Sequence, residues 1–133
     1  MSLPHKGKLL GLDLGSRKTG LAITDLNQSV IFLREEIQHK NKEELLRQLQ
    51  ELCQTENPVG AVLGLPRLMS GKDSEQTEKT QAMGDYLMQE LKLPYIWVDE
   101  RLSSHLAGKN MPKGALLDSQ AARLILELHL GLY

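Results

Sequence analysis

The spacing of hydrophobic residues along the chain changes near residue 40. Before it, short and largely apolar runs such as KLLGLDL at 8–14 are separated by turn residues, which is typical of strands. After Asn41, Leu45, Leu49 and Leu52 recur at helical spacing, and Asn57-Pro58 ends that pattern. In chain order, the predicted elements are strands at 8–14, 19–24 and 29–37, a helix at 42–54, a strand at 59–65, a helix at 73–91, a strand at 94–98, a short helix around 102–107 and a helix at 117–130.

This order predicts an α/β fold. The first three strands are joined by such short turns that they must run antiparallel. The strands at 59–65 and 94–98 follow helical crossovers and are nearly all apolar, as expected of buried parallel strands. We therefore expect a five-stranded mixed sheet flanked by helices, in a single domain over residues 8–133. Residues 1–7 show no periodicity and are interpreted as a flexible lead-in.

Composition narrows the class of protein but not its activity. The chain has 133 residues, 41% of them hydrophobic and 25% charged, and no apolar run approaches the ~20 residues of a membrane span. Cys53 is the only cysteine, so an internal disulfide is excluded and a reducing, cytoplasmic compartment is favoured. A net charge of -1 neither indicates nor excludes a nucleic-acid partner, and 4% aromatic residues argue against a base-stacking platform.

Three acidic residues stand where carboxylates are informative. Asp13 lies inside an apolar strand on the same face as Leu9 and Gly11, where an unpaired charge is costly. Glu100 follows a buried strand, at the end where the crevice of a parallel sheet opens. Asp118 begins the last helix. Each also has a structural interpretation: a turn cap for Asp13, an exposed strand-end acid for Glu100, and a favourable interaction with the helix dipole for Asp118.

If the three carboxylates converge, they form an all-oxygen site suited to Mg²⁺ or Mn²⁺. Ala121 and Ala122 favour this, because small residues one turn after Asp118 allow its helix to approach the sheet closely. The histidines and Cys53 have no spacing typical of a zinc site.

Basic residues surround these acids. The segment 101–117 contains no acid and includes Arg101, Lys109 and Lys113, which predicts a clamp for a phosphodiester backbone, with a solvated loop as the alternative. Further candidates for nucleic-acid binding are Arg17 and Lys18 in the first turn and Arg67 and Lys72 in the loop after 59–65.

Four motifs together resemble the YqgF family, also called RuvX, of Holliday-junction resolvases. They are GLDLGSRKTGLAITD at 11–25, GLP with a later glycine at 64–71, DERLSS at 99–104 and DSQAA at 118–122. The resemblance implies a ribonuclease H-like fold, with Asp13, Glu100 and Asp118 matching the metal-binding acids. It also implies a nuclease that processes precursor 16S ribosomal RNA. The stretch between DERLSS and DSQAA is shorter than is usual in the family, which bears on substrate choice more than on metal binding.

Several functions stay open on the sequence alone. A metal-dependent endonuclease needs no side-chain nucleophile, and no Ser-His-Asp arrangement is present to supply one. Its substrate is precursor ribosomal RNA or a four-way DNA junction. A non-catalytic RNA-binding or ribosome-assembly module would keep the same acids. Asp13-Leu14-Gly15-Ser16 also resembles the first phosphate loop of actin-like ATPases, which need two such domains. A homodimer is compatible with each of these functions, and none requires a membrane.

Overall fold

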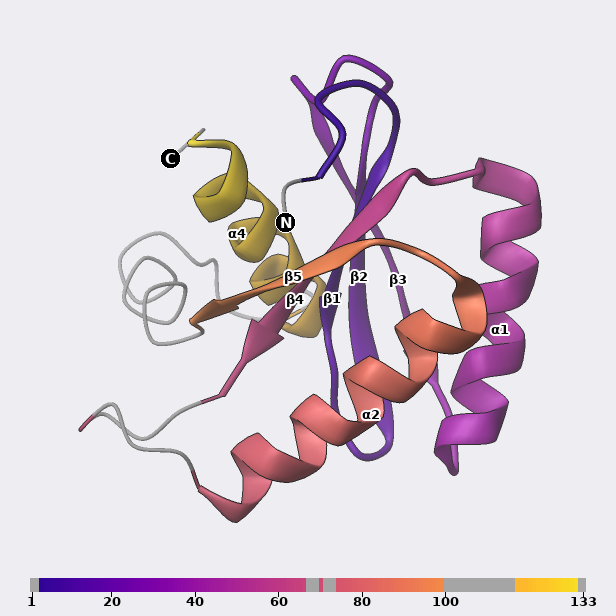
Figure 1. Cartoon of the computed structure of the whole chain (residues 1–133), viewed down its shortest axis with the longest axis vertical. Coiled ribbons are helices and arrows are strands. Elements are labelled where there is room, and N and C mark those ends of the chain that lie inside the picture. The colour runs from indigo at the N-terminus through magenta and orange to yellow at the C-terminus, as the bar shows by residue number, and fades with distance from the viewer. Residues whose placement is uncertain (1–2, 67–69, 71–73, 100–116, 132–133) are drawn as a thin grey trace.

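The chain forms one five-stranded mixed sheet with helices packed against it (Figure 1). The computed structural model describes residues 3–66, 70, 74–99 and 117–131, and of residues 117 and 118 it describes the helical backbone. Across the sheet the order is β3-β2-β1-β4-β5, with β1 at Leu9–Asp13, β2 at Lys18–Thr24, β3 at Ile31–Gln38, β4 at Gly60–Leu65 and β5 at Tyr95–Asp99. The helices of the described part are α1 at Lys42–Glu56, α2 at Glu75–Leu91 and α4 at Leu117–Leu130.

Strand directions follow the connections, as predicted. β2 is antiparallel to both β1 and β3, which are its hairpin neighbours. β4 lies parallel to β1, and β5 lies parallel to β4, because helices α1 and α2 carry the chain back between them. The predicted α/β class and mixed sheet are confirmed. The predicted short helix around 102–107 lies outside the described residues.

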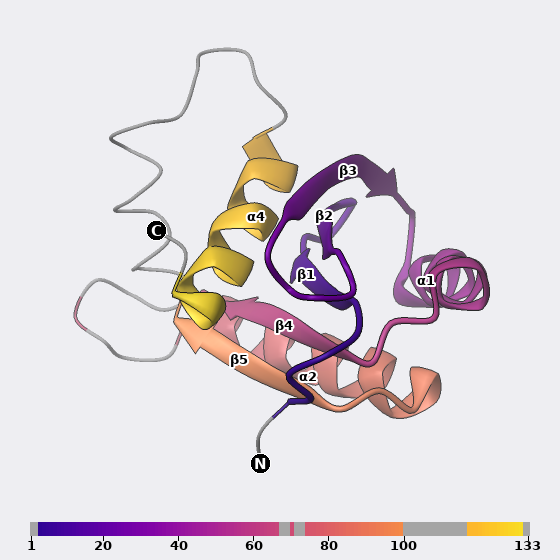
Figure 2. The same ribbon diagram turned by 90° about the horizontal axis from the view of Figure 1, so that it is seen from above.

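The two faces of the sheet bury separate apolar clusters. On one face Leu10 and Leu12 of β1 pack with leucines of α1 and with Leu87 and Met88 of α2. On the other face Leu9 packs with Ala122 and Leu126 of α4. Figure 2 shows α4 on the opposite side of strands β1–β3 from α1. Alternation along β1 therefore assigns Leu9, Gly11 and Asp13 to the α4 face of the sheet.

Helix ends are fixed by side chains that the sequence makes recognisable. Asn41 precedes α1, and its Oδ1 accepts a hydrogen bond from the backbone N–H of Glu44 at 2.8 Å, as its N-cap role predicts. α1 continues two residues beyond the predicted end and stops at Asn57, which has left-handed backbone angles. Helix α2 begins at Glu75, because Ser74 and Thr77 form a reciprocal capping box.

Strand β3 starts at Ile31, two residues later than predicted. The reason is the side chain of Asp25, whose Oδ1 accepts hydrogen bonds from the backbone N–H groups of Ser29 at 2.8 Å and Val30 at 2.9 Å. These bonds keep both residues in the turn. They also lower the pKa of the Asp25 carboxyl, since they stabilise its charged form.

Residues 3–7, predicted to be a flexible lead-in outside the fold, contribute to it. Leu3 is 4% exposed and packs in the α4-side cluster with Leu9 and Val62. Gln28 Nε2 donates hydrogen bonds to the carbonyl oxygens of Pro4 at 2.9 Å and Gly7 at 3.0 Å. One leucine and a few hydrogen bonds thus attach this short segment to the fold.

Candidate active site at the carboxyl end of the sheet

The carboxyl ends of β1, β4 and β5 lie at one edge of the sheet. Asp13 is the last residue of β1, and Asp99 is the last residue of β5, where it pairs with Leu65 of β4. Both acids are half-buried. Asp13 belongs to the α4 face. Asp99 lies two residues after Trp97 in β5 and therefore shares its face, which is the α2 face. Asp13 thus has the position at which ligands bind in open α/β sheets.

Gly11 brings α4 unusually close to β1. A Cβ atom added to Gly11 would lie 2.6 Å from the carbonyl oxygen of Ala122 and 2.7 Å from Cγ of Leu126. Such distances are shorter than real carbon contacts, so only glycine permits this approach. The expectation that small residues let this helix approach the sheet is confirmed by Ala122, which is fully buried.

A hydrogen bond fixes where α4 begins relative to β1. Ser119 Oγ donates to the carbonyl oxygen of Arg34 in β3 at 2.7 Å, and Ser119 is fully buried. Arg34 pairs with Leu21 of β2, which in turn pairs with Leu12 of β1. The start of α4 is therefore level with the last residues of β1, and residue 118 stands at the same end of the sheet as Asp13.

Of the three predicted metal ligands, the structure describes Asp13 and the backbone of Asp118. Asp13 ends β1, and Asp118 is the second residue of α4, where the structure describes the helical backbone. Glu100 lies outside the described residues. Within residues 3–66, 70, 74–99 and 117–131, no group of three histidine, cysteine or acidic side chains is arranged to hold a metal ion. The convergence of all three carboxylates stays a prediction.

Two of the seven basic residues predicted to bind nucleic acid lie in the described part of the chain. Arg17 and Lys18 are exposed at the β1–β2 turn, which borders the Asp13 end of the sheet. The other five candidates, Arg67, Lys72, Arg101, Lys109 and Lys113, lie outside the described residues.

Comparison with known proteins identifies the family. The family model described as "RuvX: Holliday junction resolvase" matches residues 7–131. The chain belongs to the RuvX family. It is 33% identical over 132 residues to a Maridesulfovibrio salexigens protein named "Putative pre-16S rRNA nuclease", covering 93% of this chain and 98% of that protein. An Oleidesulfovibrio alaskensis protein of the same name is 34% identical over 133 residues, with 94% and 92% covered.

Solved structures show the same fold at low identity. "T. thermophilus RuvC in complex with Holliday junction substrate" matches with a TM-score of 0.62 and 11% identity, covering 95% of each chain. The fowlpox virus resolvase with its Holliday-junction DNA matches with a TM-score of 0.53 and 14% identity, covering 94% of this chain and 98% of that one. The ribonuclease H-like fold predicted from the motifs is therefore confirmed for this RuvX family member. None of its described helices is long and apolar enough to cross a membrane.

Sequence reasoning missed the role of His39 in this RuvX chain. His39 is 4% exposed, and its Nε2 lies 2.9 Å from Oγ1 of the fully buried Thr19. Its backbone N–H donates to the carbonyl oxygen of Arg17 at 2.9 Å. Nδ1 is buried and has no hydrogen-bond partner in the described part of the chain. Burial lowers the pKa of His39, and the nearby Glu44 carboxylate opposes this shift.

This lowered pKa predicts how the stability of the fold depends on pH. His39 takes up a proton near pH 6.5 in the unfolded chain but only at lower pH in the folded chain. The free energy of unfolding therefore falls as the pH drops below about 6.5. His129 adds a slope of the same sign, because burial and then the His5 charge lower its pKa. We expect His39→Gln to reduce the slope by up to about 1.4 kcal/mol per pH unit, the value for one proton. Urea unfolding from about pH 7 to pH 5 measures this, and an unchanged slope would contradict it.

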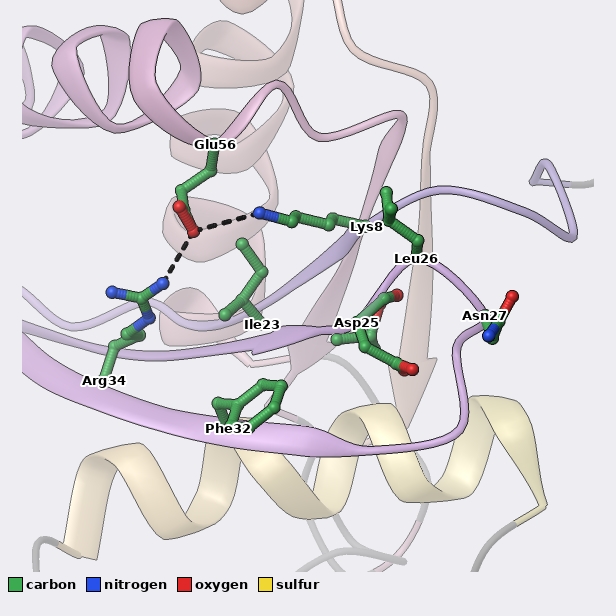
Figure 3. Close-up of a pocket in the computed structure, with 9 residues that line it drawn as sticks. Lys8, Ile23, Asp25, Leu26, Asn27, Phe32, Arg34 and Glu56 are labelled. Atoms are coloured by element: carbon green, nitrogen blue, oxygen red, sulfur yellow. Dashed lines mark hydrogen bonds and ion pairs between the residues drawn. The ribbon is translucent and has the colours of Figure 1, made fainter.

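A hollow of about 380 Å³ lies at the start of β1, at the end of the strand opposite Asp13 (Figure 3). Here Glu56 of α1 accepts from Arg34 of β3 at 2.6 Å and pairs with Lys8 at 3.4 Å. The Glu56 side chain is 13% exposed, whereas that of Arg34 is 42% exposed. Glu56 thus joins α1 to β3 and to the residue before β1, at the other end of β1 from Asp13, and this hollow has a structural role.

We expect Glu56→Gln to lower the free energy of unfolding by about 1 kcal/mol, since it leaves two cations facing each other without their shared anion. The effect should shrink at high salt, because Arg34 and Lys8 are partly exposed. Lys79→Gln is the control, as it breaks an exposed pair with Glu75 and should change stability by less than about 0.5 kcal/mol. Equal effects of the two substitutions would show that the Glu56 contacts are no stronger than a surface pair.

Proposed function

We propose that this chain is a metal-dependent endonuclease that hydrolyses phosphodiester bonds in structured nucleic acid. The observation that carries the proposal is the position of Asp13, at the carboxyl end of the central strand β1 and level with the start of α4. The close contact of Gly11 with Ala122 fixes this arrangement. Membership of the RuvX family agrees with it.

The residues fit a divalent metal ion. Asp13, Glu100 and Asp118 offer carboxylate oxygens, which are the donors that Mg²⁺ and Mn²⁺ prefer. When bound, such an ion lowers the pKa of an attacking water and stabilises charge on the attacking and leaving oxygens. Of these three acids, Asp13 is the one that ends a described strand. Arg17 and Lys18 at the adjacent turn offer positive charge to flanking phosphates.

The substrate we propose is the 5′ end of precursor 16S ribosomal RNA. Support for this RNA comes from the two relatives at 33% and 34% identity, which are named "Putative pre-16S rRNA nuclease" and match along nearly the whole chain. A four-way DNA junction is the second candidate, favoured by the likeness to RuvC bound to a Holliday junction, with a TM-score of 0.62. That likeness is one of fold, so the ribosomal RNA precursor comes first.

A cleavage assay separates these functions. Purified protein is incubated with a precursor 16S RNA fragment and with a four-way DNA junction, in Mg²⁺, in Mn²⁺ and with EDTA. The proposal predicts cleavage of the RNA that requires the metal. Cleavage of the junction alone would make the four-way DNA junction, and not the precursor RNA, the favoured substrate. Binding of RNA without cleavage in either metal would instead favour a non-catalytic RNA-binding module.

A further inference from the structure

A hollow of about 460 Å³ opens beside the β1–β2 turn, on the side of α1. It is lined by Arg17, Lys18, Gln38, His39, Lys40 and Glu44. These residues come from the β1–β2 turn, the start of β2, the end of β3, the β3–α1 connection and the first turn of α1. The hollow therefore lies at the same end of the sheet as Asp13.

Positive charge dominates this hollow. It contains three cations and one acid, a net charge of +2, whereas the whole chain carries -1. Arg17 and Lys40 are exposed, and neither forms an ion pair within the described residues. Lys18 Nζ is 3.9 Å from Glu36, at the outer limit of an ion pair. Such a concentration of charge attracts anions even on a protein that is slightly acidic overall.

Backbone hydrogen bonding sets the distance between the main-chain positions of Arg17 and Lys40. Arg17 is tied through its carbonyl oxygen to the backbone N–H of His39, and His39 precedes Lys40. The buried contact of His39 with Thr19 joins the same connection to β2. Lys42, in the first turn of α1, takes no part, because its ammonium group lies 4.7 Å from the centre of the Tyr86 ring. Arg17 and Lys40 are thus carried by rigid backbone, although their side chains are exposed.

The hollow is within reach of a strand that passes Asp13. Asp13 pairs with Gly20 of β2, and Lys18 lies two residues before Gly20, about 7 Å closer to the β1–β2 turn. A phosphate backbone that crosses this end of the sheet meets the β1–β2 turn next, and then the hollow. Successive phosphates of a nucleic acid could thus contact Lys18, Arg17 and Lys40 in turn.

We propose that this hollow binds backbone phosphates of the nucleic-acid strand that flanks the scissile bond, through Arg17, Lys18 and Lys40. The inference rests on the proposed function and extends it by adding a substrate path from Asp13 around the β1–β2 turn toward α1. Contacts to phosphates carry no sequence information, so binding here is independent of base sequence. The ligand class is a polyanionic backbone and not a single nucleotide.

The test is the salt dependence of binding, measured by fluorescence anisotropy with a labelled RNA duplex. Asp13→Asn serves as the background, so that cleavage does not interfere, and Arg17→Ala with Lys40→Ala is added to it. Each lost phosphate contact should make the slope of log K against log salt shallower by about 1 unit, so the double variant should lose about 2 units. The loss should be the same for duplexes of different sequence.

Lys6→Ala is the matched control. It removes the same charge from an exposed lysine whose Nζ contacts Asn27, at the other end of β1. Its slope should equal that of the background protein, and all variants should share one thermal midpoint because these side chains are exposed. A double variant with the slope of Lys6→Ala would overturn the hollow as a phosphate site while leaving the cleavage assay unaffected. Absence of RNA binding by the background protein would overturn this inference together with the proposed function. If inorganic phosphate competes as effectively as unlabelled duplex, the ligand of the hollow is a small anion and not a phosphate backbone.

Discussion

Asp13→Asn is expected to abolish metal-dependent cleavage and to leave the fold intact. Asparagine has the same shape, but its neutral amide is a much poorer ligand for Mg²⁺ than a carboxylate. Changes in residues that only orient a metal ligand already cost about 10–100-fold, so loss of a ligand should cost more than about 100-fold in cleavage rate. The measurement is the single-turnover rate of cleavage of precursor RNA in Mg²⁺, for the wild type and the variant.

Stability separates this role from a structural one. If Asp13 lies among other carboxylates, removing its charge should leave the free energy of unfolding in EDTA unchanged or raise it, because like charges repel. A loss of about 3 kcal/mol would instead show that Asp13 caps the following turn. Asp99→Asn is the matched control, since Asp99 ends β5 at the same edge but belongs to the α2 face. It should keep cleavage within about tenfold of the wild type.

The order of elements was predictable because each one carries a strong hydrophobic pattern. The run at 59–65 has no polar residue, and Gly60–Leu65 is buried throughout as β4. The boundaries were less predictable, because side-chain hydrogen bonds decide them. Asp25 holds Ser29 and Val30 in a turn, although valine favours a strand. Only the folded geometry brings that carboxylate to those two N–H groups.

The candidate site was predictable where a residue is anomalous within its own element. Asp13 stands out as an acid in an apolar strand, and the structure places it at the carboxyl end of β1. His39 gave no such signal, because its role depends on Thr19, which is 20 residues away. Lys40 was missed for the same reason. It appears as one of several charges along the sequence, and only the pairing of β2 with β3 brings it beside Arg17.

Gly11 is the residue whose substitution should most disturb the arrangement around Asp13. The Cβ atom of an alanine here would lie 2.6 Å from the backbone carbonyl oxygen of Ala122. A backbone atom has no rotamer to change, so α4 must move away from β1. Overpacking of this kind costs about 1–3 kcal/mol, and we expect Gly11→Ala to lie near the upper end. Urea unfolding measures this loss.

Gly84→Ala provides the comparison on the opposite face. Its Cβ would lie 2.5 Å from Cη2 of Trp97 and 2.9 Å from Cδ2 of Leu63, which are side-chain atoms that can shift. Alanine also favours a helix over glycine by about 1 kcal/mol, so the net loss of stability should be smaller than for Gly11→Ala.

The two variants should differ most in activity per folded molecule. Gly11→Ala displaces the start of α4, and with it residue 118, from the level of Asp13, whereas Gly84→Ala leaves α4 in place. At a temperature where both variants are folded, we expect cleavage by Gly11→Ala to fall at least about tenfold, because misplacement by about 1 Å can cost 100-fold. Cleavage by Gly84→Ala should stay close to the wild-type rate. A wild-type rate for both variants would show that catalysis does not depend on the close contact of α4 with β1, and it would contradict a role for Asp118 in the site.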